Sequence, residues 1–186
     1  DFYKDYLKEY ELALKDYAKA IALNSDNFQT SRAVNNRALI FEARGEDKLA
    51  IEEYTKAIEL DPEYPLFYSN RANLRQHLGD YTKAIADYDK AINRESDNPD
   101  WYEYRADCYV EMEDYTSSLK DYDKAIDLAP NDPYQYNNRA DFYDDIEKYE
   151  LALKDYATAI ALNSDDDETT RAINNRAIIY EARGED

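Results

Sequence analysis

The sequence contains very little cysteine, histidine, glycine or proline, and each shortage excludes a class of protein. One Cys and one His among 186 residues exclude an internal disulfide, a cysteine-based zinc site and a histidine-based triad or metal site. Three Gly and five Pro are few, so most of the chain must lie in regular elements. No apolar run approaches the ~20 residues that a membrane-spanning helix needs.

Basic side chains are also few beside the acidic ones. The chain has 23 Lys and Arg against 42 Asp and Glu, which gives a net charge of −19. Such a surface repels nucleic acid and anionic membranes, so we expect neither as a partner, and a charged partner should be basic. The single cysteine leaves the compartment open, with the cytoplasm favoured.

The main positive feature of the sequence is an internal repeat. The dipeptide Ala-Ile occurs five times, at intervals of 37, 34, 34 and 34 residues, and an acidic residue and a tyrosine precede it at a fixed offset. Around each copy, apolar residues at i, i+3, i+4 and i+7 predict one stripe of an amphipathic helix, and a shorter amphipathic helix is predicted before it. The copies are Ala20-Ile21, Ala57-Ile58, Ala91-Ile92, Ala125-Ile126 and Ala159-Ile160.

Turn residues occur at one fixed place between the short and the long helix. Gly45, Gly79 and Gly184 lie there, where a left-handed residue would end one helix and reverse the chain. Glu113 and Glu147 lie at the same place in other units, and the left-handed conformation would cost each roughly 1 kcal/mol. Connections this short imply antiparallel neighbours.

This pattern resembles the tetratricopeptide repeat. The resemblance is carried by Tyr68-Ser69-Asn70-Arg71-Ala72, followed by Gly79-Asp80-Tyr81 and then Ala84-Ile85. It implies an all-α fold, a right-handed α-α superhelix (solenoid) of antiparallel helix pairs, that binds proteins without catalysis. We expect a single array over residues 1-186, with a partial unit at 1-31, full units at about 32-65, 66-99, 100-133 and 134-169, and a lone first helix at 170-186.

Two linkers depart from the pattern. The stretches Asn24–Ser31 and Asn163–Thr170 are three residues longer than the other linkers and lack proline, so we expect them to loosen or re-angle the array. The second contains Asp165-Asp166-Asp167-Glu168, which lacks the alternating spacing and central glycine of a calcium loop. We therefore expect a solvated loop, with Thr169 or Thr170 capping the next helix.

Polar side chains recur where the first helices of such an array would line a concave groove. Asparagine occupies one position in four units, and Tyr104 replaces it in a fifth. An amide offers a donor and an acceptor, so a row of amides could hold the backbone of an extended peptide, as asparagine ladders do in this family. The alternative is that these amides bond neighbouring repeats. The asparagines of this ladder are Asn36, Asn70, Asn138 and Asn175.

The acidic charge is concentrated in the middle of the chain. Residues 99–147 hold fourteen acidic and four basic side chains, and Glu103, Asp107 and Asp141 should face or edge the groove. A basic peptide would relieve their repulsion, whereas the alternative is a solvated acidic face. The basic residues with which this family clamps acidic chaperone tails are missing, so we do not expect that ligand.

An arginine register looks like an anion site, but its spacing favours a structural role. Arg37, Arg71, Arg105 and Arg139 each precede an acidic residue by sixteen positions, which places the two on facing helices of one unit. We predict ion pairs within the units. No phosphate loop or nucleophile motif is present, so the sequence predicts no enzyme, no metal and no cofactor.

A second, longer period suggests an alternative role. Residues 9–47 and 148–186 align without gaps at an offset of 139 and differ at nine of thirty-nine positions. The alternative is therefore a structural array that stacks end to end, by self-association or as an excerpt of a longer solenoid. A further possibility is the recruiting arm of an enzyme whose catalytic domain lies outside these residues.

Overall fold

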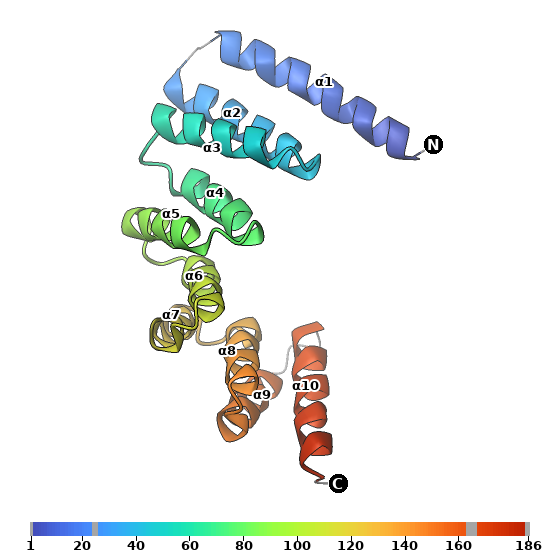
Figure 1. The fold of residues 1–186 in the computed structure, drawn as a ribbon, viewed down its shortest axis with the longest axis vertical. Coiled ribbons are helices and arrows are strands. Elements are labelled where there is room, and N and C mark those ends of the chain that lie inside the picture. The colour runs from blue at the N-terminus through green and yellow to red at the C-terminus, as the bar shows by residue number, and fades with distance from the viewer. Residues whose placement is uncertain (1, 24–25, 163–166, 185–186) are drawn as a thin grey trace. The chain divides into compact units, whose positions relative to one another are not determined.

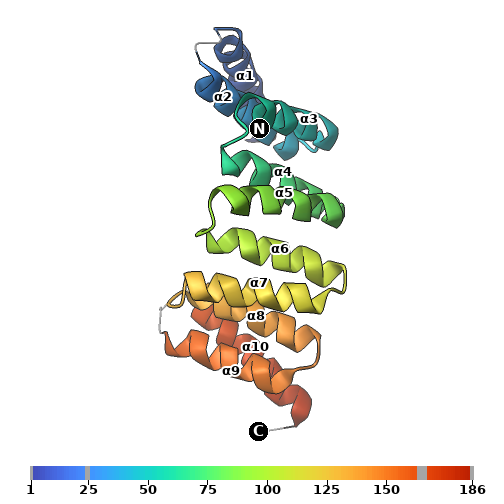
Figure 2. The ribbon, with the colours of Figure 1, turned by 90° about the vertical axis from the view of Figure 1, so that its left-hand side faces the viewer.

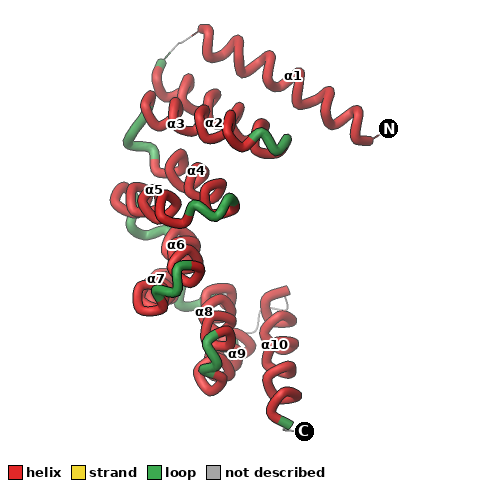
Figure 3. The backbone as a smooth tube through the Cα atoms, in the orientation of Figure 1, coloured by secondary structure: helices red, strands yellow, loops and turns green. Residues whose placement is uncertain are grey.

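The computed structural model describes residues 2–23, 26–162 and 167–184, and it describes side chains from residue 8 onward. Helices are the only regular elements in these ranges (Figure 1, Figure 3). The chain divides into two compact units, Asp1–Ser96 and Asp97–Asp186. Each unit contains antiparallel helix pairs, which confirms the predicted all-α fold. Whether the units form a single array stays a prediction.

The first unit contains five helices in its described residues. The most extensive contacts join α2 to α3 and α4 to α5, and α1 packs on α2. The helices are α1 (Phe2–Leu23), α2 (Asn27–Ala43), α3 (Asp47–Leu60), α4 (Pro65–His77) and α5 (Tyr81–Arg94).

The second unit repeats this arrangement in its described residues. The main contacts join α6 to α7 and α8 to α9, and α10 packs on α9 and α8. Figure 2 shows the short loops joining neighbouring helices at alternate ends. The helices are α6 (Pro99–Glu111), α7 (Tyr115–Leu128), α8 (Pro133–Asp145), α9 (Tyr149–Ala161) and α10 (Asp167–Arg183).

The two longer linkers are partly helical where the structure describes them, which corrects the expected loop, and whether they loosen or re-angle the array stays a prediction. Both α2 and α10 have 17 residues, against 13 in α4, because the additional residues extend the helix instead of the loop. At α2 the reason is a cap, since Asp26 Oδ1 accepts from the backbone N–H of Gln29 at 2.6 Å. Thr169 and Thr170 lie inside α10 and are not its cap. The acidic run falls partly in α10, and its residues 165 and 166 lie outside the described part of the chain.

The turn prediction is confirmed at all five positions. Gly45, Gly79 and Gly184 have φ of 71°, 76° and 67°. Glu113 and Glu147 adopt the same left-handed conformation, each with φ of 58°. The two glutamates therefore carry the strain that glycine avoids.

Small alanines and one tyrosine from the second helix of each pair form the helix contacts. In the first unit Ala38, Ala50 and Tyr54 have no exposed area, and they pack together with Leu74 from α4. The second unit repeats this with Ala140 and Tyr156, again without exposed area. Because the alanines let the helix backbones approach closely, the first helix of each pair keeps a constant face toward the second.

The predicted ion pairs are present in all four complete pairs of helices. Arg105 Nε donates to Asp121 Oδ2 at 2.7 Å, and Arg139 Nε donates to Asp155 Oδ2 at 2.7 Å. The corresponding bonds in the first unit are Arg37 to Glu53 at 2.7 Å and Arg71 to Asp87 at 2.8 Å. These arginines are therefore structural.

Candidate functional site

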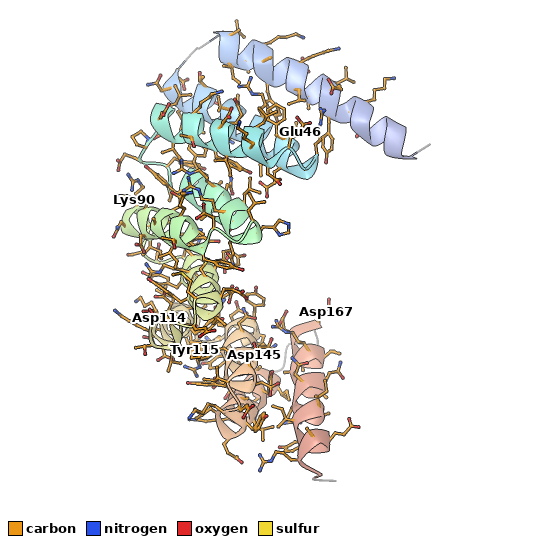
Figure 4. The ribbon with its side chains drawn as sticks, viewed as in Figure 1. Glu46, Lys90, Asp114, Tyr115, Asp145 and Asp167 are labelled. Atoms are coloured by element: carbon orange, nitrogen blue, oxygen red, sulfur yellow. The ribbon has the colours of Figure 1, made fainter. Side chains whose placement is uncertain are left out.

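An acidic cavity of about 330 Å³ lies between α8 and α10 in the second unit. Its walls are three aspartates, one amide and one apolar side chain, and Asp145 and the start of α10 at Asp167 are labelled in Figure 4. Burial and the neighbouring carboxylates raise the pKa of both Asp144 and Asp145 above the usual aspartate range. The lining residues are Asp141, Asp144, Asp145, Asn175 and Ile178.

Asp141 is the most highly bonded residue of this cavity. Its Oδ1 accepts from Asn175 Nδ2 at 2.9 Å, and the hydroxyl of Tyr156 donates to the same oxygen. Arg171 Nη2 donates to the other oxygen. Two predicted groove residues, Asp141 and Asn175, are thus brought together, on α8 and α10 of the second unit.

Arg171 is a site residue that the sequence analysis missed. It lies on α10, donates to Asn138 Oδ1 at 3.0 Å and to Glu168 Oε2 at 3.2 Å, and also pairs with Asp141. A basic side chain of the protein therefore already occupies part of the acidic surface. The sequence did contain a signal for this role, because Arg171 lies four residues before Asn175 and therefore on the same face of the helix.

The predicted site residues on α6 differ in accessibility. Glu103 is only 4% exposed, and its Oε1 accepts from the Tyr134 hydroxyl at 3.1 Å. Burial and the charge of Asp107 raise the pKa of Glu103 to about 8. Burial also raises the pKa of Asp107, which accepts from Tyr122, while Tyr104 is half-buried beside them. Glu103 thus lies largely beyond the reach of a ligand.

The asparagine ladder is bonded between repeats in both units. Asn70 Nδ2 donates to Asn35 Oδ1 at 3.0 Å in the first unit, while Asn138 and Asn175 are held by Arg171 and Asp141 in the second. Asn36 lines a separate cavity of about 330 Å³ between α1 and α2. Three of the four asparagines therefore bond neighbouring repeats, as the structural alternative predicts, and peptide binding stays a proposal.

A set of tyrosine hydrogen bonds was also not predicted. Tyr122 donates to Asp107 at 2.5 Å, and Tyr156 donates to Asp141, which lies at the same spacing of fifteen residues. In the first unit the Tyr54 hydroxyl donates to Glu42 at 2.5 Å. The spacing of fifteen residues was visible in the sequence, because Tyr122 and Tyr156 each follow an aspartate of the preceding short helix at that distance. These bonds fix the groove-side carboxylates in one orientation.

Other kinds of site find no support in the described part of the chain. There, no three His, Cys, Asp or Glu residues are placed to hold a metal ion. None of the helices that the structure describes combines the length and apolar character needed to span a membrane. Cys108 is fully buried, which raises its pKa to about 12 and keeps the thiol protonated.

Comparison with family models finds three matches. A model described as TPR repeat matches residues 38–79, and models described as tetratricopeptide repeat match residues 70–133 and 136–166. Among curated proteins, the photosystem I assembly protein Ycf3 of Synechococcus sp. (strain CC9605) is 34% identical over 74 residues, which cover 37% of this chain. The chain spans less than half of the length of that relative, 43%.

Solved structures share the fold at low sequence identity. MamA has a TM-score of 0.72 and 19% identity, with 86% of this chain and 91% of MamA covered. YrrB, described as a TPR protein with an unusual peptide-binding site, has a TM-score of 0.71 and 17% identity, with 93% and 86% covered. Family models, neighbours and helix pairs agree, and the chain belongs to the tetratricopeptide repeat family.

Proposed function

We propose that this chain is a non-catalytic scaffold that binds a basic peptide segment along the first helices of its second unit. The observation that carries the proposal is the cavity between α8 and α10, where Asp141, Asp144 and Asp145 converge. A lysine or arginine side chain of the ligand would enter this cavity and neutralise the carboxylates.

The chemistry of the cavity suits a long cationic side chain. The raised pKa of Asp144 and Asp145 reflects burial and mutual repulsion, both of which a bound cation offsets. Ile178 is 60% exposed and gives the methylene stem of such a side chain an apolar surface to contact. The pairing of Arg171 with Asp141 supports the proposal, because it places a guanidinium group of the protein against one carboxylate of the same cavity.

The asparagine ladder would hold the peptide backbone in this proposal. Each amide can form several hydrogen bonds, and the bonds between repeats use only part of that capacity. Asn175, which lines the cavity, donates to Asp141 through Nδ2 at 2.9 Å, so its carbonyl oxygen can accept from a peptide N–H. Bonding between repeats would then orient the amides for the ligand.

The comparisons support a binding role in general terms. Tetratricopeptide repeat proteins mediate protein–protein interactions, YrrB carries a peptide-binding site, and a repeat domain of Spaghetti (RPAP3) has been solved with the HSP90 peptide SRMEEVD. That peptide ends in acidic residues, whereas the cavity between α8 and α10 of this chain is lined by Asp141, Asp144 and Asp145. We therefore propose a ligand of the opposite charge.

Calorimetric titration with a lysine-rich peptide tests this function. The double variant D144N/D145N should bind the peptide about tenfold more weakly, because two charges are removed from the cavity without changing its shape. The matched control is E52Q/E59Q, which removes two exposed charges from α3 in the first unit and should leave the affinity unchanged. Equal affinity for lysine-rich and glutamate-rich peptides would contradict the proposal.

We propose end-to-end self-association as a second role, because a different observation favours it. Both α1 and α10 have an apolar face that is covered in the other helix pairs, whereas no helix among the described residues covers it in these two. This role does not depend on peptide binding, because it uses other faces of the helices.

A further inference from the structure

The uncovered face of α10 is revealed by comparison with its near-copy α2. Ile173 of α10 is 45% exposed, whereas its counterpart Val34 in α2 is 3% exposed. Ala177 is exposed, whereas its counterpart Ala38 has no exposed area because α3 covers it. The face of α10 thus has the residues of a first helix, and no helix among the described residues packs on it as a second helix would.

The helix α1 shows the converse. Its residues match α3 at an offset of 37, yet Tyr17 is partly exposed where its counterpart Tyr54 has no exposed area. Ala20 is exposed, whereas its counterpart Ala57 is fully buried. The face of α1 thus has the residues of a second helix, and none of the described helices packs on it as a first helix would.

A cavity marks the uncovered side of α1. It has a volume of about 330 Å³ and is lined on α1 by Tyr17, Ala20 and Leu23. In the second unit the corresponding residues Tyr156 and Ala159 have no exposed area, because α8 packs on α9 there. The cavity beside α1 therefore lies where a first helix would pack on α1.

We infer that the uncovered face of α10 docks on the uncovered face of α1 of a second copy of this chain, in the geometry of the α2–α3 pair. This inference rests on the self-association role proposed above and is independent of peptide binding. Two contact residues of α3 have identical counterparts on α1: Ala50 corresponds to Ala13, and Tyr54 corresponds to Tyr17.

Charge complementarity identifies the register. In the α2–α3 pair, Arg37 donates to Glu53 at 2.7 Å, and Tyr54 donates to Glu42 at 2.5 Å. The counterpart of Arg37 is Arg176, which makes no ion pair with any residue that the structure describes. The counterpart of Glu53 is Asp16.

Asp16 is already arranged like its counterpart. It pairs with Lys19 at 3.0 Å, just as Glu53 pairs with Lys56 at 2.7 Å, and it is 76% exposed. Docking would therefore form the pair between Arg176 and Asp16 of the second copy. It would also bring Tyr17 of that copy to Glu181, the counterpart of Glu42.

The contact is heterologous, because α10 of one copy meets α1 of the next. Each copy keeps one unused face, so association continues beyond a dimer unless a ring closes. The net charge of −19 opposes the approach of two copies, and physiological salt screens that repulsion.

Sedimentation velocity of residues 1–186 in physiological salt, from micromolar to millimolar concentration, tests the inference. The weight-average sedimentation coefficient should rise with concentration past that of a dimer. R176E and D16R should each weaken association about tenfold, and the charge-exchanged double variant D16R/R176E should recover most of it. The control K90E makes the same charge change on α5 (Figure 4), where it should have no effect.

The outcomes separate the inference from the role on which it rests. If the unmodified chain stays a monomer at every concentration, self-association itself is wrong, and these faces are covered by something other than a second copy. If the chain associates but R176E and D16R have no effect, the α2–α3 register is wrong. The variant A177E places a charge on the α10 face and should also abolish association while leaving helical circular dichroism unchanged, and association that survives it excludes this face.

Discussion

Arg71 and Asp87 form a two-point ion pair across the α4–α5 interface. The Nη2 and Nε atoms of Arg71 donate to the two carboxylate oxygens of Asp87 at 2.7 and 2.8 Å, and Arg75 Nη1 donates to the same carboxylate at 2.6 Å. The side chain of Asp87 is only 6% exposed. Because the pair recurs in every complete helix pair, it contributes to the repeat geometry itself.

The first prediction concerns this pair. The variant D87N removes the charge that two arginines share in a buried position, and it should lower the free energy of unfolding by about 3 kcal/mol. Urea unfolding followed by circular dichroism measures the change. The control D80N breaks the exposed pair of Asp80 with Lys83 and should cost less than about 1 kcal/mol. Similar losses in both variants would contradict the structural role of Asp87.

The second prediction concerns the left-handed turn residues. E113G and E147G should each raise the free energy of unfolding by about 1 kcal/mol, since glycine adopts a positive φ without strain. G79A should lower it by a similar amount, although a Cβ at Gly79 meets no atom within 4 Å. Thermal unfolding of the three variants checks the expectation, and destabilisation by E113G would disprove it.

The third prediction concerns pH. The pKa of Glu103 is raised to about 8 in the folded chain from 4.5, so the folded state holds a proton that the unfolded state has lost. The resulting stability is fully present below pH 4.5 and is lost as the pH rises through 8. E103Q should therefore flatten the decline in unfolding free energy between pH 4.5 and about pH 8. An unchanged decline would show that Glu103 is not its source.

The fourth prediction concerns Arg171. R171A removes the side chain that pairs with Asp141, so it should raise the affinity for a lysine-rich peptide about threefold to tenfold. The control is R32A, at the equivalent position of α2, where the guanidinium lies over the ring of Phe28. R32A should leave affinity unchanged. Weaker peptide binding by R171A, with helical content preserved, would mean that Arg171 does not compete with the ligand.

The fold was predictable because its determinants are local and repeated. A spacing of sixteen residues places Arg139 and Asp155 on facing helices of one unit, so the ion pair follows from the repeat alone. The starts of α2 and α10 were not predictable in the same way. No proline marks them, and the cap by Asp26 depends on backbone geometry that the sequence does not display.

The candidate site was less predictable than the fold, because neighbouring repeats determine it. Position alone places Glu103 beside the groove, but Tyr134 and the packing of α6 against α8 bury it. The bonds of Arg171 to Asn138 and Asp141 join α10 to α8, and the repeat pattern contains no information about which neighbour a long side chain reaches. The carboxylates Asp144 and Asp145, by contrast, follow from helical spacing.

The salt dependence of peptide binding tests the central claim most directly. If the cavity formed by Asp141, Asp144 and Asp145 recognises a basic segment, the affinity for a lysine-rich peptide should fall steeply as salt rises, and D144N/D145N should reduce that slope. Titrations at several salt concentrations, with the unmodified chain and this variant, give both slopes. An affinity that is independent of salt, or a preference for acidic peptides, would contradict the account.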